Sequence, residues 1–133
     1  MTPVLLDTHA WAWSLTADQR LSAAAVDAMG QAETVCVGAI SFFEIGQKVR
    51  IGKWPEMAPF LDRLVSIADE QGAWVVDLSP EIALLAAGME WDHRDPFDRI
   101  IAATAIVRGL ALVSADVVFD TLPSFPKWRG RVW

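Results

Sequence analysis

Short apolar runs alternate along this chain with longer segments in which apolar residues recur at helical spacing. The short runs predict buried strands, and the longer segments predict helices with one buried face. We expect strands at 4–6, 34–39, 74–76 and 110–113, and an edge strand at 132–133. The expected helices lie at 8–15, 22–32, 41–51, 59–70, 79–88 and 95–108. This alternation predicts an α/β fold with a mostly parallel central sheet of four to five strands, flanked by helices.

The last of these helices has a well-defined start. Asp95 suits the N-cap position and Pro96 suits the first helical position. We therefore prefer the cap over direct metal binding as the role of Asp95. The segment 100–107 that follows is almost wholly apolar, as expected for a helix buried against a sheet. Asp98 lies in the first turn of this helix, and a carboxylate beside such an apolar segment needs a partner that compensates its charge.

Four acidic residues are expected to meet at one edge of the sheet. Asp7 and Asp116 follow the C-terminal ends of two predicted strands. Glu44 lies in the first turn of the helix after the second strand, and Asp98 in the first turn of the helix before the fourth. In parallel sheets, ligands bind at the edge formed by the C-terminal ends of the strands, near the point where the strand order reverses. The topology therefore predicts an acidic cluster.

Clustered carboxylates repel one another unless they are protonated or neutralised by a cation. The chain has a single Cys and two His, so the predicted donors are oxygen atoms. Such a set suits Mg²⁺ or Mn²⁺ and does not suit Zn²⁺. Hard divalent ions in an acidic pocket are typical of phosphodiester hydrolysis. The sequence thus favours a metal-dependent nuclease.

Each acid also has a structural interpretation, and spacing alone leaves both open. Asp7 could be a turn residue, and Asp116 could cap the short segment that follows it. Ser41 and Glu44 have the spacing of a capping box, and Asp98 is the third helical residue after an N-cap.

Basic and aromatic residues near these acids carry weaker signals. Lys48 and Lys53 follow Glu44, and a solvated face and a phosphate-binding role are equally consistent with them. For His9 we favour a hydrogen-bonded structural role over a role in the site. We assign Trp11 and Trp13 to the core and an interface rather than to base stacking.

Composition narrows the class of protein further. At 133 residues, 53% of them hydrophobic, the chain is expected to form one domain over 1–133, and its seven Trp hint at a protein interface. A net charge of −6 argues against holding nucleic acid by bulk electrostatics, but bound cations can still meet phosphates. One Cys and the absence of a signal-like N-terminus predict a cytoplasmic protein. No apolar run is long enough to span a membrane.

Four short motifs span nearly the whole chain: Leu5 to Trp11, Ser41 to Lys53, His93 to Ala105 and Leu112 to Asp116. They resemble the motifs of PIN-domain proteins of the VapC toxin type. They occur in the family's order, and together they are highly specific. Ser114 stands where Thr is frequent, so the hydroxyl is retained.

The resemblance implies a Mg²⁺-dependent endoribonuclease, with Mn²⁺ as a substitute, that acts as the toxin of a type II toxin–antitoxin pair. Such toxins are inhibited by a cognate protein antitoxin and are usually dimeric. The implied catalytic quartet is Asp7, Glu44, Asp98 and Asp116, and the resemblance makes Asp7 and Asp98 direct metal ligands. The expected convergence of the acids at one edge of the sheet adds Asp116 to the residues that hold the metal. Accessory roles fall to Thr8, Asp95 and Ser114, and RNA contacts to Lys48, Lys53 and Arg99.

A phospho-acceptor receiver module also gathers acids around Mg²⁺, but it needs a Lys after a late strand. The lysines here are at 48, 53 and 127, which excludes that module. A PIN-like scaffold for protein partners and a housekeeping RNA-processing nuclease remain as alternatives.

Overall fold

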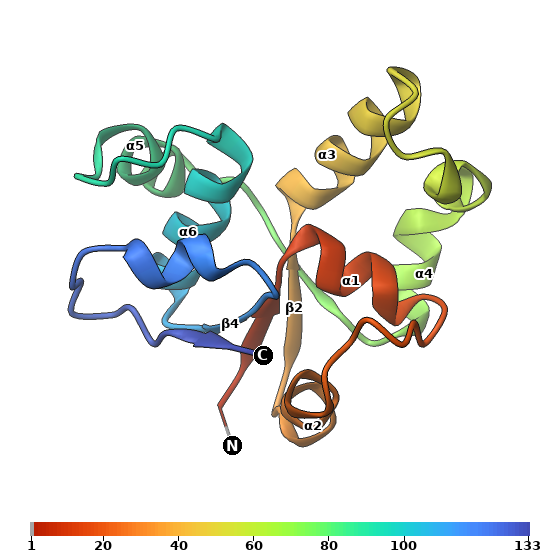
Figure 1. Cartoon of the computed structure of the whole chain (residues 1–133), viewed down its shortest axis with the longest axis horizontal. Coiled ribbons are helices and arrows are strands. Elements are labelled where there is room, and N and C mark those ends of the chain that lie inside the picture. The colour runs from red at the N-terminus through yellow and green to blue at the C-terminus, as the bar shows by residue number, and fades with distance from the viewer. Residues whose placement is uncertain (1) are drawn as a thin grey trace.

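The structure is a computed structural model that describes residues 2–133, and five strands within that range form a single parallel sheet (Figure 1). The strand order is β3-β2-β1-β4-β5, which places β1 at the centre. This confirms the prediction of a mostly parallel sheet of four to five strands. The strands are β1 (Val4–Leu6), β2 (Val35–Gly38), β3 (Trp74–Val76), β4 (Ala111–Val113) and β5 (Arg131–Val132).

Six α-helices and two 3₁₀ helices connect the strands in the part of the chain that the structure describes. The α-helices are α1 (Thr8–Ser14), α2 (Ala23–Gln31), α3 (Ala39–Arg50), α4 (Leu64–Glu70), α5 (Pro80–Gly88) and α6 (Pro96–Arg108). The 3₁₀ helices are η1 (Pro55–Arg63) and η2 (Val117–Thr121). None of the helices within residues 2–133 has the length and apolar character needed to cross a lipid bilayer.

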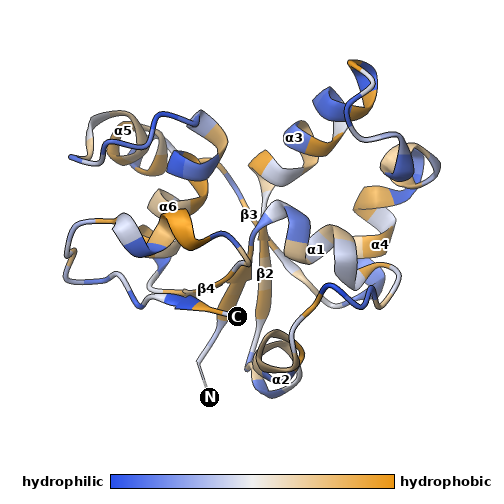
Figure 2. Ribbon diagram, in the orientation of Figure 1, coloured by the Kyte–Doolittle hydropathy of each residue, from blue (hydrophilic) through white to orange (hydrophobic). Residues whose placement is uncertain are grey.

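The core consists of two apolar layers, one on each face of the sheet. Successive strand residues point to opposite faces, so Leu5 packs in one layer while Val4 and Leu6 pack in the other. Both faces are covered, which is why β1 to β4 lack charged residues and are largely apolar; Figure 2 shows this along β2 and β4. The first layer includes residues of α5, α6 and η2, and the second includes residues of α1, α2, α3 and α4.

The start of α6 follows the prediction closely. The side chain of Asp95 accepts hydrogen bonds from the backbone N–H groups of Phe97 and Asp98, with Pro96 at the first position of the helix. The helix ends at Gly109, whose φ of +66° lies in the left-handed region that glycine adopts without strain.

Two predicted helices differ from the structure. The helix predicted at 59–70 is a 3₁₀ helix up to Arg63, followed by the short α4. Two prolines, Pro55 and Pro59, lie in that 3₁₀ segment, and Pro59 has no N–H for an α-helical hydrogen bond. Helix α3 begins at Ala39 rather than at Ser41, with Gly38 at the N-cap and no side-chain cap.

Candidate active site

Asp7 lies directly after β1, with a buried carboxylate that is bonded on both oxygens. Its Oδ1 accepts the backbone N–H of Ala10 at 2.8 Å, which makes it the N-cap of α1. Its Oδ2 accepts the hydroxyl of Ser114 at 2.5 Å. Because Asp7 is only 8% exposed, these bonds fix the carboxylate in one orientation.

Glu44 is held by a buried hydroxyl pair between α1 and α3. The hydroxyl of Thr8 donates to Oε1 of Glu44 at 2.6 Å and lies 2.8 Å from the hydroxyl of Ser41. Lys48 Nζ lies 2.6 Å from Oε2 of Glu44. The interpretation of Ser41 and Glu44 as a capping box is therefore wrong, because Gly38 caps α3 and both side chains face Thr8 instead.

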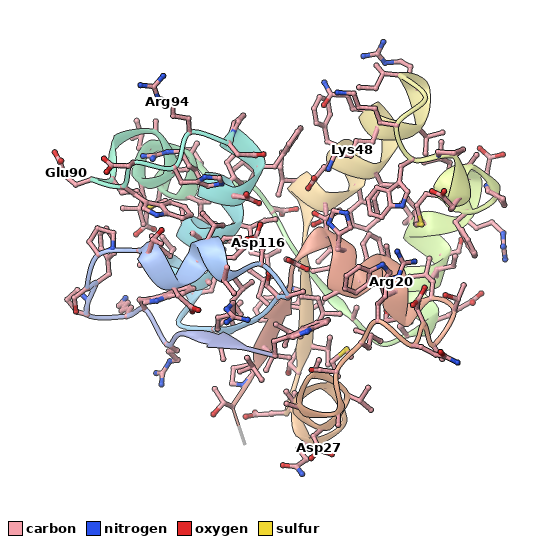
Figure 3. The ribbon with its side chains drawn as sticks, viewed as in Figure 1. Arg20, Asp27, Lys48, Glu90, Arg94 and Asp116 are labelled. Carbon is pink, nitrogen blue, oxygen red and sulfur yellow. The ribbon has the colours of Figure 1, made fainter. Side chains whose placement is uncertain are left out.

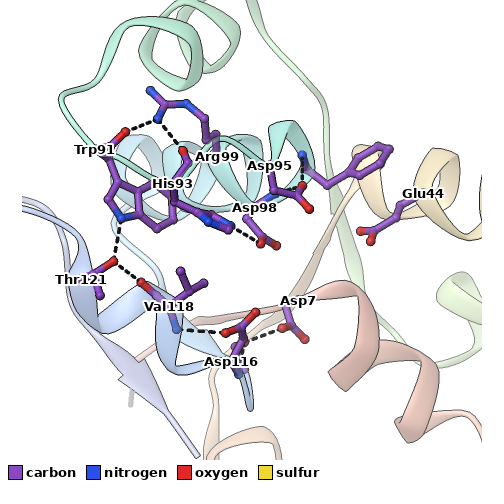
Figure 4. Close-up of polar contacts among 12 residues, drawn as sticks. Asp7, Glu44, Trp91, His93, Asp95, Asp98, Arg99, Asp116, Val118 and Thr121 are labelled. Carbon is purple, nitrogen blue, oxygen red and sulfur yellow. Dashed lines mark hydrogen bonds and ion pairs between the residues drawn. The ribbon is translucent and has the colours of Figure 1, made fainter.

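Asp98 projects from the first turn of α6 and meets a residue from the preceding loop. Its Oδ2 lies 2.6 Å from Nε2 of His93 in the loop before α6 (Figure 4). Asp98 is half-buried, whereas Asp95 is exposed. The predicted N-cap role of Asp95 is confirmed by its bonds to the backbone N–H groups of the first turn.

Asp116 follows β4 and is exposed. Its Oδ1 accepts the backbone N–H of Val118 at 2.9 Å, so the predicted capping of the following segment is present. Its own N–H donates to Oγ of Ser114 at 3.0 Å. Ser114 therefore links the backbone of Asp116 to the carboxylate of Asp7.

The four predicted acids line one cleft of about 370 Å³. They come from the ends of β1 and β4, from the first turn of α6 and from the second turn of α3, and Figure 4 shows their side chains around a common space. Glu44 was predicted in the first turn of its helix, but α3 begins at Ala39 and so places it one turn later. A residue can cap a helix and also line the cleft, as Asp7 and Asp116 do. The residues lining the cleft are Asp7, Thr8, His9, Trp13, Glu44, Lys48, Asp95, Asp98, Ile101, Ala115 and Asp116.

The electrostatics of the cleft favour a bound cation. Burial raises the pKa of Asp7, and the charge of Asp98 raises it further, against the bond from Ser114 that lowers it. Burial also raises the pKa of Asp98, as do the charges of Asp95 and Asp116. These carboxylates are thus close enough to repel one another, and a cation would relieve the repulsion.

The donor atoms fit a hard divalent cation. Asp7, Asp98 and Asp116 offer carboxylate oxygens to the same cleft, which is the ligand type that Mg²⁺ and Mn²⁺ prefer. Among residues 2–133, a tighter group of ligand atoms, all within 4.8 Å of one another, belongs to His93, Asp95 and Asp98. Both sets include Asp98, and the position of a bound ion would show which set holds it.

The basic residues singled out from the sequence lie in different surroundings. Lys48 borders the cleft, and Figure 3 shows it opposite Asp116, whereas Lys53 is exposed beyond the end of α3. The guanidinium of Arg99 donates to four backbone carbonyls, which leaves it little capacity to contact RNA. These carbonyls belong to Ala86, Met89, Trp91 and His93. Arg99 therefore holds the loop that carries His93 against α6.

Aromatic residues at the cleft were underestimated from the sequence. Trp11 is fully buried in the core, as expected, but His9 is exposed and Trp13 is half-buried, and both line the cleft. The His9 ring stacks on Trp54, with ring centres 4.6 Å apart. No sequence signal marked Trp54, because it lies 45 positions away, in the turn after α3.

Comparison with known protein families matches residues 4–124 to the PIN domain. The chain belongs to the PIN-domain family. One relative, Ribonuclease VapC22 of Mycobacterium tuberculosis, is 37% identical over 117 residues, covering 87% of this chain and 88% of that protein. The resemblance to VapC-type PIN domains drawn from the four motifs is thereby confirmed.

Solved structures agree with this PIN-domain fold. VapBC2 of Rickettsia felis, bound to a promoter DNA fragment, superposes with a TM-score of 0.63 at 14% identity, covering 96% of each chain. VapBC-5 of Mycobacterium tuberculosis gives a TM-score of 0.63 at 17% identity, covering 98% of each chain. FitAcB of Neisseria gonorrhoeae gives 0.58 at 20% identity, covering 95% of this chain and 99% of that one.

Proposed function

We propose that this PIN domain is a Mg²⁺-dependent endoribonuclease that acts as the toxin of a type II toxin–antitoxin pair. The observation that carries the proposal is the convergence of Asp7, Glu44, Asp98 and Asp116 on one cleft. It is supported by the 37% identity to a protein named Ribonuclease VapC22 over most of both chains.

In this proposal Asp7, Asp98 and Asp116 hold Mg²⁺, for which Mn²⁺ can substitute. When bound, such an ion supplies an activated water and positive charge beside the phosphate oxygens. The chain's own residues orient the donors: Ser114 fixes Asp7, and His93 fixes Asp98. Such supporting bonds keep ligand oxygens directed at one point.

Glu44 has the position of an acceptor for a water proton or a metal-bound water. Thr8 holds one of its oxygens and Lys48 pairs with the other, so the carboxylate is fixed and its charge is partly balanced. Lys48 and Lys53 supply positive charge on the α3 side, where RNA phosphates would approach. This local charge offsets the net charge of −6 for a polyanionic substrate.

The proposed partners are an RNA substrate, a cognate protein antitoxin and a second copy of the chain, all in the cytoplasm. The antitoxin is supported by the similarity in fold to toxin–antitoxin complexes such as VapBC-5. A housekeeping nuclease would use the same cleft without an antitoxin, and a PIN-like scaffold would not need four converging acids. Growth arrest on expression, relieved by a co-expressed antitoxin and absent in Asp98→Asn, separates the toxin from both alternatives.

The test of the nuclease uses the purified chain, free of any partner, with total cellular RNA. Cleavage is expected in Mg²⁺, and it should stop in EDTA and in the Asp98→Asn variant. The substitution keeps the size of the side chain while it removes the charge. Cleavage that persists in EDTA or in the variant would contradict the proposed site.

A further inference from the structure

Three aromatic rings form a continuous surface at one side of the acidic cleft. We call His9, Trp13 and Trp54 the aromatic wall. The rings of His9 and Trp54 are nearly parallel, with centres 4.6 Å apart and an interplanar angle of 26°. The ring of Trp13 is tilted by 57° against His9 at 5.7 Å. His9 and Trp13 line the same cleft as Asp7 and Glu44, so the aromatic wall adjoins the acidic residues.

Core packing does not account for this wall. Trp11, two residues before Trp13, has 0% exposure, and its indole N–H donates to Gln71. In contrast His9 is exposed, and Trp13 and Trp54 are half-buried. An exposed ring that is already stacked from behind presents a flat, rigid apolar face at little entropic cost. The cleft therefore has a surface suited to another planar ring.

Two cations are interleaved with these rings. Lys48 Nζ lies 5.7 Å from the ring centre of Trp54, and Arg20 Cζ lies 5.0 Å from that of Trp13. Aromatic faces alternating with cations are typical of surfaces that bind unpaired nucleic acid, because bases stack on the rings while phosphates meet the charges. The wall is also continuous with the cleft that is proposed to cut RNA.

We propose that the aromatic wall stacks an unpaired base of the RNA beside the phosphate that is cut. His9 offers the outer face, Trp54 supports it from behind, and Trp13 flanks it. A base held in a duplex is already stacked on its neighbours, so the wall selects single-stranded segments or loops. This inference rests on the proposed ribonuclease function, and it adds the part of the substrate that the cleft recognises.

Binding of a defined probe tests the wall without relying on cleavage. Fluorescence anisotropy would follow a labelled ten-nucleotide oligoadenylate in Mg²⁺, with the Asp98→Asn chain to prevent turnover. A probe of equal length that has the sugar–phosphate backbone without bases measures the contribution of the bases. We expect the oligoadenylate to bind more tightly than the baseless chain.

Substitutions at His9 separate stacking from mere occupancy of the position. His9→Leu is expected to weaken oligoadenylate binding by about five-fold to one hundred-fold, the range for the loss of one base stack, whereas His9→Phe keeps it. Both variants should bind the baseless chain as the parent does. Trp74→Leu is the matched control, because Trp74 is 59% exposed and is the first residue of β3, whereas the cleft lies beyond the C-terminal ends of β1 and β4.

Equal binding of oligoadenylate by the Leu and Phe variants would overturn the wall, as would a baseless chain that binds as tightly as the oligoadenylate. Cleavage of total RNA by the unaltered chain is measured in parallel. If the chain cleaves total RNA but binds the oligoadenylate and the baseless probe equally well, the wall alone is overturned. Base-dependent binding without cleavage would overturn the nuclease and leave the wall as a binding surface.

Discussion

The hydroxyl of Ser114 donates a hydrogen bond of 2.5 Å to Oδ2 of Asp7 across two adjacent strands. Leu6 pairs with Val113, so Asp7 and Ser114 are the first residues beyond the paired segment of β1 and β4. Because Ser114 also accepts the N–H of Asp116, one buried hydroxyl positions two of the four acids.

Replacement of Ser114 tests this arrangement. Ser114→Ala leaves Oδ2 of the buried Asp7 without its donor, and we expect roughly a 10-fold to 100-fold loss of metal affinity or activity. Ser114→Thr keeps the hydroxyl and is expected to retain most of both. Titration of Mg²⁺ against the rate of RNA cleavage measures the effect. Equal losses in the two variants would indicate that the hydroxyl is not what matters.

Asp95 and Asp98 lie in the same helical turn but are expected to respond differently to neutralisation. Asp95→Asn keeps an N-cap side chain and should leave stability and RNA cleavage close to those of the parent. Asp98→Asn should abolish cleavage. Asp95→Ala should lower the free energy of unfolding by about 0.5–2 kcal/mol through loss of the cap. RNA cleavage is measured in Mg²⁺, and the stability of each variant is measured by thermal melting. Loss of cleavage in Asp95→Asn without loss of stability would instead make Asp95 a functional carboxylate.

The raised pKa values of Asp7 and Asp98 predict how the stability of the metal-free protein depends on pH. Both carboxyls have an ordinary pKa of 3.8 and bind protons more tightly in the folded state. Their stabilising contribution is therefore complete below that value and is lost as the pH rises through the raised pKa values. Thermal melting in EDTA should show Asp98→Asn gaining stability over the parent as the pH rises. A constant difference between the two proteins at all pH values would contradict this.

Substitution of Arg99 separates its structural role from the RNA contact that the family resemblance implied. Arg99→Lys keeps the charge, but an ammonium group cannot reach four carbonyls at once. We expect the free energy of unfolding to fall by about 2 kcal/mol or more, since several hydrogen bonds to a charged donor are lost. Arg94→Lys is the control, because Arg94 is exposed and points away from the molecule (Figure 3). Unchanged melting with weaker RNA binding would favour the RNA contact.

The sequence predicted the sheet and the acidic cleft because both follow from local patterns combined with one topological rule. Short apolar runs located β1, β2, β3 and β4. The C-terminal edge of a parallel sheet then brought together Asp7 and Asp116, and helices starting at that edge added Glu44 and Asp98. None of these steps required knowledge of side-chain contacts.

What the sequence could not predict depends on contacts between distant residues. Ser41 looked like a cap because a capping box is a local pattern, but its partner Thr8 lies 33 positions away. Gly38, the true N-cap of α3, carries no side chain to mark it. Likewise the stacking of His9 on Trp54 joins α1 to the turn after α3, and Arg99 gave no sign that it would bind carbonyls.

The central claim is that the acids in the cleft form the metal centre, and locating a bound ion tests it most directly. Crystals of the chain grown with Mn²⁺ would reveal the ion by its anomalous scattering. The account predicts a peak among the carboxylates of Asp7, Asp98 and Asp116. A peak held by His93 and Asp95 with Asp98, or no ordered Mn²⁺ in the cleft, would contradict it.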